Sequence, residues 1–371
     1  MRILIVTPWF PTAEHPESGI FVAREAAALA ERHNVHVLHM DWNHADATPL
    51  PVDGARVTRR AFRRHRPSDL LRARRVVRRV ARDADVVHTH ALPGLLPWLI
   101  GRPAPAPWVH SEHFSGLTAP ETLRGPERAL TRMLRRVLRR PALVVAESER
   151  LASAVRSARS GPVAVVPCVV PSAAVADRPR EAGVLRLVGV GGLIPRKGPD
   201  VAVEAVAELR QRGVDARLVW VGGGPLFERL DDMVRARGLE DAVTFTGPLP
   251  TEGVEAALDG ADLFILPTLG DNFCVVVAEA LSHGRPVVTG SQTGAVDYAP
   301  AEASIFVSTH EPVAYADAVI ELARRTAHLT AAAIAGMVRG RFSPEHVRML
   351  LEAGYERAAG GGVSASIRGE S

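Results

Sequence analysis

Short runs of β-branched and other apolar residues alternate with longer stretches of helical periodicity along the sequence. This alternation is typical of α/β folds, in which helices connect the strands of parallel sheets. Helical patterns in the first half include residues 21–32 and 127–140. The strands expected in this half are 3–7, 35–40, 85–89, 108–111, 143–147 and 163–167.

The pattern is interrupted once, at the Pro-, Ala- and Arg-containing segment 171–183, which we interpret as an interdomain linker. It then resumes with strands expected at 185–190, 216–221, 242–246, 263–266, 286–289 and 305–307, and helices at 199–212, 226–237, 274–283 and 312–325. We therefore expect two Rossmann-like, doubly wound parallel-sheet domains facing a cleft, at 1–172 and 173–343. A C-terminal helix, 344–357, and a Gly/Ser-rich disordered tail, 358–371, follow. Ligands of such domains bind at the carboxyl ends of the strands.

Composition excludes several classes of protein. The chain of 371 residues is 47% hydrophobic and 23% charged, and no apolar run reaches the roughly 18 residues of a membrane span. The N-terminus reads as a first strand and not as a signal peptide. The two cysteines, Cys168 and Cys274, are too few for a disulfide scaffold or a cysteine zinc site. We expect a cytoplasmic protein.

Charge is distributed unevenly. Residues 1–172 carry 26 arginines against 15 acidic residues, and the remainder carries 19 basic against 26 acidic residues, so the two parts have net charges of +11 and −7. The arginines gather at 56–82 and 124–140, where they form either a solvated helix face or a field that attracts phosphates, acidic acceptors or an anionic membrane surface. Contact with the inner membrane face is one option. Leu130, Met133, Leu134, Val137 and Leu138 form an apolar stripe that would lie on a membrane or pack on a sheet. Without an aromatic stacking platform, we expect no nucleic-acid partner.

The chain contains a single lysine, Lys197, among 45 basic residues. It lies in the segment Val-Gly-Val-Gly-Gly-Leu-Ile-Pro-Arg-Lys-Gly-Pro at 188–199, between an expected strand and an expected helix. Glycines that include Gly191 and Gly192 allow backbone amides to approach a ligand, and Arg196 and Lys197 supply positive charge. The helix directs its positive end to the same place. These features favour a phosphate, although the spacing matches neither a P-loop nor a dinucleotide fingerprint.

A second segment, 267–280, follows the strand expected at 263–266. Asp271 and Asn272 are natural helix caps, and the amides of Phe273 and Cys274 at the helix start are suited to a phosphate or a sugar hydroxyl. Glu279 lies on an apolar helix face, where a carboxylate needs a partner such as a ribose hydroxyl or an arginine.

Together these segments resemble the retaining glycosyltransferases of family 4, which have the two-domain GT-B fold. No single motif is decisive, but their order and spacing along nearly the whole chain carry the resemblance. The matching motifs are at 1–11, 18–21, 85–90, 112–113, 165–167, 191–198, 221–225, 243–247, 271–279, 284–288 and 342–343.

The resemblance implies roles for individual residues. In the family, a Glu-x7-Glu pair grips the donor, so Glu279 is expected to bind ribose and Asp271, shorter by one methylene than the family Glu, the transferred sugar. In the family, an Arg-x4-Lys pair also neutralises the diphosphate. Lys197 matches the lysine of this pair, but Gly192 stands at the position of the arginine. Arg196 would compensate for the missing positive charge. His113 is implied as a catalytic residue, together with Lys197 and Asp271, that bonds a sugar hydroxyl and stabilises the reacting centre. The other implied donor contacts are the phosphates for Gly19 and the nucleobase for the backbone from Gly247 to Leu249.

The expected function is transfer of a sugar, with retention, from a nucleotide-diphosphate donor to a glycan, lipid-linked or small-molecule hydroxyl, UDP-sugar being favoured and GDP-mannose next. No cofactor or metal is expected. The His-x-His pair His88 and His90, with His110 and His113 nearby, also invites a metal interpretation, but the family pattern accounts for these residues without an ion. The alternatives are a catalytically inactive sugar-nucleotide-binding homologue or partner subunit, and a non-hydrolysing sugar-nucleotide epimerase.

Overall fold

The computed structural model describes residues 1–16, 18–42, 48–63, 66–101, 106–171, 175 and 183–360. The chain forms two compact units, one of Met1–Val169 with the C-terminal helix that starts at Pro344, the other of Val170–Ser343. Most of the linker expected at 171–183 and residues 361–371 of the expected tail lie outside the described residues. The helix expected at 344–357 belongs to the first unit.

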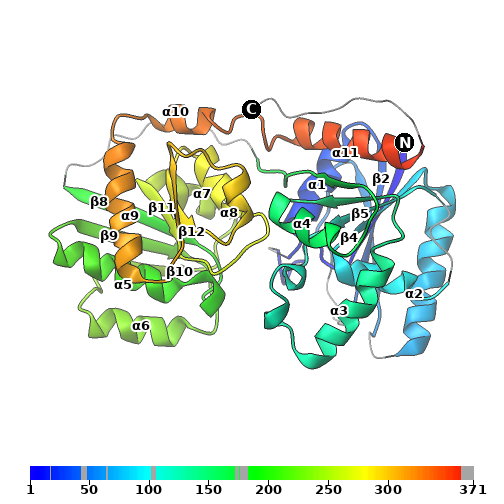
Figure 1. Ribbon diagram of the computed structural model, residues 1–371, viewed down its shortest axis with the longest axis horizontal. Helices are drawn as coiled ribbons and strands as arrows, with labels where there is room; N and C mark the ends of the chain where they lie inside the picture. The colour runs from blue at the N-terminus through cyan, green and yellow to red at the C-terminus, as the bar shows by residue number, and fades with distance from the viewer. Residues whose placement is uncertain are drawn as a thin grey trace. The chain divides into compact units, whose positions relative to one another are not determined.

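The first unit is built on a parallel sheet of seven strands within the described residues, in the order β3-β2-β1-β4-β5-β6-β7 (Figure 1). Its strands are β1 Arg2–Thr7, β2 Asn34–Asp41, β3 Ala55–Ala61, β4 Val86–His90, β5 Trp108–Glu112, β6 Leu143–Ala146 and β7 Val163–Val165. Its helices are α1 Ile20–Ala30, α2 Pro67–Val80, α3 Gly125–Val137, α4 Glu149–Arg156 and α11 Pro344–Ala358.

The central strand β1 shows why this sheet needs helices on both faces. Its side chains alternate between two apolar clusters: Ile3 and Ile5 pack with α1 and α11, and Leu4 and Val6 with α2, α3 and α4. Because successive side chains of a strand point to opposite faces, a continuous apolar run requires cover on both.

The second unit repeats this architecture with six parallel strands among its described residues, in the order β10-β9-β8-β11-β12-β13. The strands are β8 Val184–Val190, β9 Asp215–Val221, β10 Val243–Gly247, β11 Leu263–Leu266, β12 Val287–Gly290 and β13 Ser304–Val307. The helices are α5 Pro199–Gln211, α6 Phe227–Ala236, α7 Thr251–Gly260, α8 Val275–Ser282, α9 Pro312–Arg325 and α10 Ala331–Gly336. The expectation of two doubly wound α/β domains is confirmed.

The pattern did not predict β3 or α2, which lie in the first arginine run. In β3, Arg56 and Arg60 are exposed and the other residues, Arg59 included, are only half-buried, which suits the edge of a sheet but hides the strand signal. In α2 only Ala73 and Val77 are fully buried. Short connecting 3₁₀ turns also occur at Ala81–Asp83, Leu92–Trp98, Ser115–Leu117, Pro120–Thr122, Pro195–Lys197 and Gly294–Asp297.

The second arginine run forms α3, and its apolar stripe packs into the first unit. Leu134, Val137 and Leu138 are buried in the cluster shared with α2 and α4, whereas Met133 is exposed. The sheet-packing interpretation of this stripe is therefore the one observed.

Several side chains of both arginine runs also serve the fold, because they donate to backbone carbonyls of neighbouring loops. The donors are Arg72, Arg74, Arg128, Arg139 and Arg140. Contact of the remaining arginines with an anionic membrane stays a prediction.

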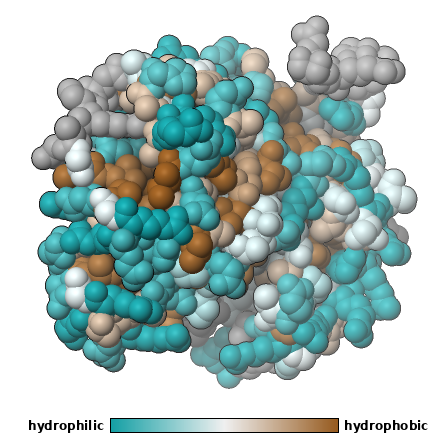
Figure 2. All heavy atoms as spheres, turned by 60° about the vertical axis from the view of Figure 1, so that its left-hand side comes forward, coloured by the Kyte–Doolittle hydropathy of each residue, from teal (hydrophilic) through white to brown (hydrophobic). Residues whose placement is uncertain are grey.

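Among the described helices, none is both long and apolar enough to cross a membrane. On the face shown in Figure 2, hydrophilic side chains cover most of the surface, with hydrophobic ones lying between them.

Candidate functional site

Lys197 ends the 3₁₀ turn that connects β8 to α5, at the carboxyl edge of the second sheet. Its Nζ donates to Asp271 Oδ2 at 2.7 Å. Arg196 Nη1 lies 3.6 Å from the same carboxylate oxygen and donates to the Gly270 carbonyl at 2.5 Å. Because β8 and β11 are neighbours, the segments after them bring two cations and one carboxylate together across 74 residues of sequence.

Asp271 is held from both sides. Its Oδ1 accepts from the amide of Cys274, the residue before α8, at 2.9 Å, while Oδ2 faces Lys197. Among the described residues no side chain caps α8, so neither Asp271 nor Asn272 is the helix cap that the sequence suggested. Burial alone would raise the pKa of this carboxyl, but the charge and hydrogen bond of Lys197, with Arg196 and the Cys274 amide, lower the pKa below its ordinary value. The ionised Asp271 carboxylate therefore stabilises the folded protein above about pH 4, and this contribution is lost as the pH falls through the lowered pKa.

The close approach of the two segments depends on Gly198. Its φ is +66°, and a Cβ built there would lie 2.2 Å from the Pro267 carbonyl oxygen. The adjacent Lys197 stem runs over Gly191, where an added Cβ would lie 3.5 Å from the lysine Cγ and Cδ. The contact at Gly191 is an ordinary van der Waals distance, so it is Gly198 that requires glycine for this approach.

We expect Gly198→Ala to destabilise the protein by about 1 to 3 kcal/mol more than Gly238→Ala. Gly238 has a similar φ, +64°, but no atom lies within 4 Å of an added Cβ, so it carries only the cost of the left-handed conformation, about 1 to 2 kcal/mol. Denaturant unfolding of both variants measures the difference. Equal losses would show that the contact with Pro267 is unimportant.

Two amides of the glycine-rich loop are bonded to backbone carbonyls of the protein itself. The Gly191 amide donates to the Val221 carbonyl, and the Leu193 amide to the Gly223 carbonyl. Trp220 Nε1 donates to the Gly191 carbonyl at 2.8 Å. These bonds tie the loop after β8 to the loop after β9, while the lysine, the arginine and the first turn of α5 remain available to an anion. An added Cβ at Gly192 would meet only the Gly223 carbonyl oxygen, at 3.6 Å, and the Ile194 Cγ1, at 4.0 Å, so this position has room for a side chain.

The start of α8 is more deeply buried than expected. Phe273 packs with Tyr298 and Phe342, and Asn272 is also buried. Cys274 adopts φ +66°, a left-handed conformation that favours glycine. Its amide is bonded to Asp271 and its carbonyl accepts from the Tyr298 hydroxyl. Burial raises the pKa of the Cys274 thiol to about 12, so the thiol is not a nucleophile.

Glu279 is the fifth residue of α8, the helix that follows Asp271 in the sequence. It is half-buried, as are Val275 and Val276, which lie one turn before it on the same stripe of the helix. At the end of β10, Gly247 has φ +72° and its carbonyl accepts from the Gly222 amide, while Leu249 is 37% exposed. All the donor residues expected in the second half therefore belong to the same unit.

His113 lies in the first unit, directly after β5. Its ring is 8% exposed, with Nδ1 2.8 Å from Glu147 Oε2 and Nε2 3.2 Å from His90 Nδ1. Burial lowers the pKa of this imidazole, but Glu147, with Glu25 and Glu112, outweighs burial and raises it. Since both nitrogens have protein partners, a direct bond to a sugar would have to break the contact with His90.

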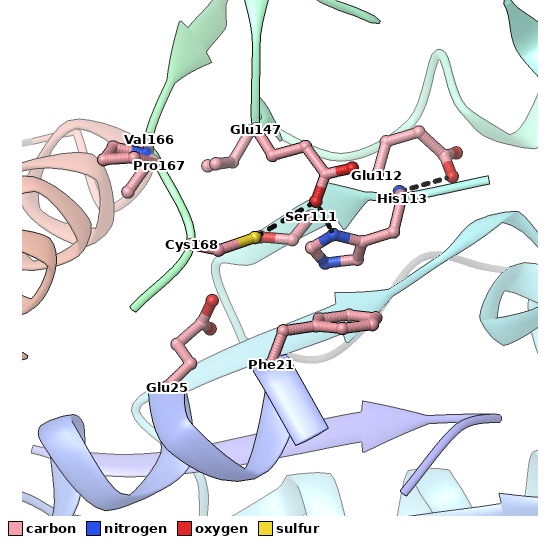
Figure 3. A pocket seen from close by; sticks show the side chains of 10 residues that line it. Phe21, Glu25, Ser111, Glu112, His113, Glu147, Val166, Pro167 and Cys168 are labelled. Atoms are coloured by element: carbon pink, nitrogen blue, oxygen red, sulfur yellow. Dashed lines mark hydrogen bonds and ion pairs between the residues drawn. The ribbon is translucent and has the colours of Figure 1, made fainter. Parts of the chain in front are cut away.

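A small pocket beside His113 has room for about one water molecule (Figure 3). The polar residues that line it are Glu25, Ser111, Glu112, His113, Glu147 and Cys168. Sequence reasoning missed Glu25 and Glu147. In the sequence, Glu25 is distinguished only as the one acidic residue of the Ala-rich helix α1. Its place beside the pocket depends on tertiary contacts.

Gly19 precedes α1 in the same unit and has φ +69°. A Cβ there would lie 2.5 Å from the Trp9 carbonyl oxygen, so this loop, like that at Gly198, requires glycine. The packing against Trp9 accounts for the glycine without a ligand.

Two family models match the chain. The one described as Glycosyltransferase Family 4 matches residues 18–173, and the one described as Glycosyl transferases group 1 matches residues 185–325. Together they cover most of both units.

Curated relatives are similar over parts of the chain. The GDP-mannose-dependent alpha-(1-6)-phosphatidylinositol monomannoside mannosyltransferase of Mycolicibacterium smegmatis is 39% identical over 29% of this chain and 30% of its own. The D-inositol 3-phosphate glycosyltransferase of Corynebacterium jeikeium is 29% identical over 64% of each chain. These matches span less than two-thirds of both relatives. The 2-deoxystreptamine glucosyltransferase of Streptomyces kanamyceticus is 29% identical over 75% of this chain and 78% of its own.

Solved structures share the fold at low sequence identity. Sucrose-phosphate synthase from Thermosynechococcus elongatus superposes with a TM-score of 0.79 at 18% identity, over 96% of this chain and 98% of that one. Anabaena HepE, in complex with UDP and glucose, superposes with a TM-score of 0.74 at 18% identity, over 95% and 99% of the two chains.

Proposed function

The chain belongs to the family 4 glycosyltransferases of GT-B fold, and from this we propose that it transfers a sugar from a nucleotide-diphosphate donor to an acceptor hydroxyl with retention. The expected donor is a UDP-sugar, with GDP-mannose next. Relatives named for GDP-mannose and a fold neighbour solved with UDP support these two choices without deciding between them.

The observation that carries this proposal is the 2.7 Å pair of Lys197 and Asp271 at the carboxyl edge of the second sheet. An ammonium has three N–H donors, so Lys197 can keep Asp271 as a partner and still donate to a phosphate oxygen. Arg196, whose side chain is 40% exposed, lies beside it and adds a second positive charge. Ligands of doubly wound sheets bind at this edge.

The chemistry follows from this placement of charge. The bond between the sugar carbon and the diphosphate oxygen breaks, and the electron pair leaves with the diphosphate, whose negative charge grows. Lys197 and Arg196 stabilise this charge more in the transition state than in the ground state, which is the condition for catalysis. The acceptor oxygen bonds to the sugar carbon on the face that the diphosphate leaves, and its proton passes to a phosphate oxygen. In this scheme the side-chain cations neutralise the diphosphate without a divalent metal.

We assign the remaining donor contacts within the second unit. Glu279 accepts from the ribose hydroxyls, and the backbone from Gly247 to Leu249 meets the nucleobase. Asp271 faces the transferred sugar at the Oδ2 edge, which requires Lys197 to turn partly towards the diphosphate. We do not assign His113 a donor contact, because both of its ring nitrogens are engaged within the first unit.

A panel of UDP, GDP, ADP and dTDP tests this proposal by thermal unfolding, with and without EDTA. We expect one nucleoside diphosphate to raise the unfolding temperature by the same increment in both buffers. A protein that no nucleoside diphosphate stabilises would contradict the donor assignment. An increment that vanishes with EDTA would contradict metal independence.

One observation favours a second candidate, a catalytically inactive sugar-nucleotide-binding homologue or partner subunit. Gly192 stands where the resemblance expects an arginine. Such a protein would pass the nucleotide panel but show neither transfer nor hydrolysis with any donor. Release of nucleoside diphosphate from each donor therefore discriminates between the two candidates.

A further inference from the structure

Three side chains of the first unit converge on one point that the proposed transfer reaction does not use. Glu25 of α1 and His88 and His90 of β4 each offer a ligand atom, and these atoms all lie within 4.8 Å of one another. Glu25 Oε1 is 3.4 Å from His88 Nδ1 and 3.3 Å from His90 Nε2. Zinc lies about 2.0 to 2.1 Å from its nitrogen and oxygen ligands. When four ligands surround it as a tetrahedron, neighbouring ligand atoms are about 3.3 to 3.4 Å apart, as Glu25 is from each histidine.

The orientation of His90 is set by a chain of hydrogen bonds. The carboxylate of Glu147 only accepts, so Nδ1 of His113 carries a proton. In the neutral form of this ring, Nε2 accepts from His90 Nδ1, whereas the protonated ring donates to it. With His113 neutral, His90 directs the lone pair of Nε2 at Glu25. Within the described part of the chain, His90 Nε2 and Glu25 Oε1 are both buried and lack a hydrogen-bond partner, although they are 3.3 Å apart. Two buried acceptors facing each other need a cation or a proton between them.

His88 is oriented in the same sense. Its Nε2 lies 2.8 Å from the Ser111 hydroxyl, to which it can donate, and this leaves the lone pair at Nδ1. The Tyr355 hydroxyl lies 2.8 Å from Nδ1 and can donate to it, so an ion bound at Nδ1 would replace this hydrogen bond. Partners that fix the ring and the tautomer of each histidine are typical of metal sites. Figure 3 shows that Glu25 also faces the pocket beside it, which has room for the water of a fourth coordination position.

We propose that Glu25, His88 and His90 bind one divalent transition-metal ion, Zn²⁺ being the ion that their chemistry and spacing fit best. Two imidazoles and one carboxylate suit Zn²⁺ better than the oxygen-seeking Mg²⁺ or Ca²⁺. The ion links α1 to the central strand β4 and neutralises the carboxylate buried between them. Its role is to stabilise the first unit, and it takes no part in neutralising the donor diphosphate. The inference does not depend on the proposed transfer function.

The experiment uses the full chain, stripped of metal with a chelator and titrated with Zn²⁺ or Co²⁺. We expect one ion to bind per chain, and Co²⁺ to show the visible absorption of tetrahedral coordination. With free Zn²⁺ at about 100 times its dissociation constant, the unfolding temperature should be about 5 °C higher than without metal. Glu25→Gln, nearly the same shape, should lower the affinity at least about tenfold. His39→Gln is the matched control, because His39 is a buried histidine of the same sheet outside the cluster, and it should keep the affinity for Zn²⁺.

The competing arrangement places a proton between His90 and Glu25. The wild-type chain would then bind no ion stoichiometrically, and the proposal would be wrong. Zn²⁺ binding that is unchanged in both Glu25→Gln and His90→Gln would also overturn it, because the ion would then lie elsewhere. Glu25→Gln keeps the test valid if His90→Gln does not fold.

Discussion

Lys197→Met is expected to lower kcat/KM for sugar transfer by about 10-fold to 1,000-fold, the usual cost of losing one group that stabilises transition-state charge. Methionine keeps most of the length and apolar contact of the lysine stem over Gly191 while it removes the ammonium. Steady-state kinetics with the donor identified by the nucleotide panel measure the loss. Because Lys197 is the only lysine, no other ammonium side chain can replace it.

This loss must be separated from a loss of stability. Lys197→Met removes the ammonium partner of Asp271, whose side chain is only 22% exposed, and an under-compensated buried charge is costly. The double variant Lys197→Met/Asp271→Asn removes that charge, so it should recover stability relative to the single variant while turnover stays low. Arg196→Met is the matched control, and its more exposed side chain at 3.6 Å should give a smaller effect. Wild-type kinetics for Lys197→Met would remove the diphosphate assignment.

Glu279→Ala is expected to weaken binding of the nucleoside diphosphate by about 10-fold to 150-fold, since a hydrogen bond to a charged group contributes about 1.5 to 3 kcal/mol. Titration calorimetry with the ribonucleotide and its 2′- and 3′-deoxy analogues locates the contact. If Glu279 takes the ribose hydroxyls, the wild type should bind a deoxy analogue about as weakly as Glu279→Ala binds the ribonucleotide. The variant itself should bind both ligands alike.

Glu252→Ala provides the control, because Glu252 is an exposed acidic residue of α7 in the same unit. It should keep the wild-type dissociation constant. The ribose assignment would be wrong if Glu279→Ala kept that constant too.

The sequence predicted the fold well because buried parallel strands are unambiguous. Val-, Ile- and Leu-rich runs such as β6 and β11 are buried on both faces. Edge strand β3 was missed because its burial is weak and its arginines obscure the alternation. The C-terminal helix could be predicted from periodicity, but its packing on α1 depends on contacts between residues more than 300 positions apart.

The donor site was only partly predictable. Lys197 and Asp271 were each singled out by local pattern, but their direct pairing depends on the order of β8 and β11 in the sheet. Whether an amide faces a ligand or an acceptor of the protein itself is a tertiary property, as Gly191 and Cys274 show. The histidine cluster was visible as His-x-His, whereas its carboxylate, Glu25, comes from a helix more than 60 residues earlier.

The most direct test of the central claim compares a nucleoside diphosphate with its monophosphate by titration calorimetry in EDTA, on the wild type and on Lys197→Met. If Lys197 holds the diphosphate, the wild type should prefer the diphosphate, and the substitution should reduce that preference while monophosphate binding changes little. Equal affinities of the wild type for both nucleotides, or a preference that survives the substitution intact, would contradict the account.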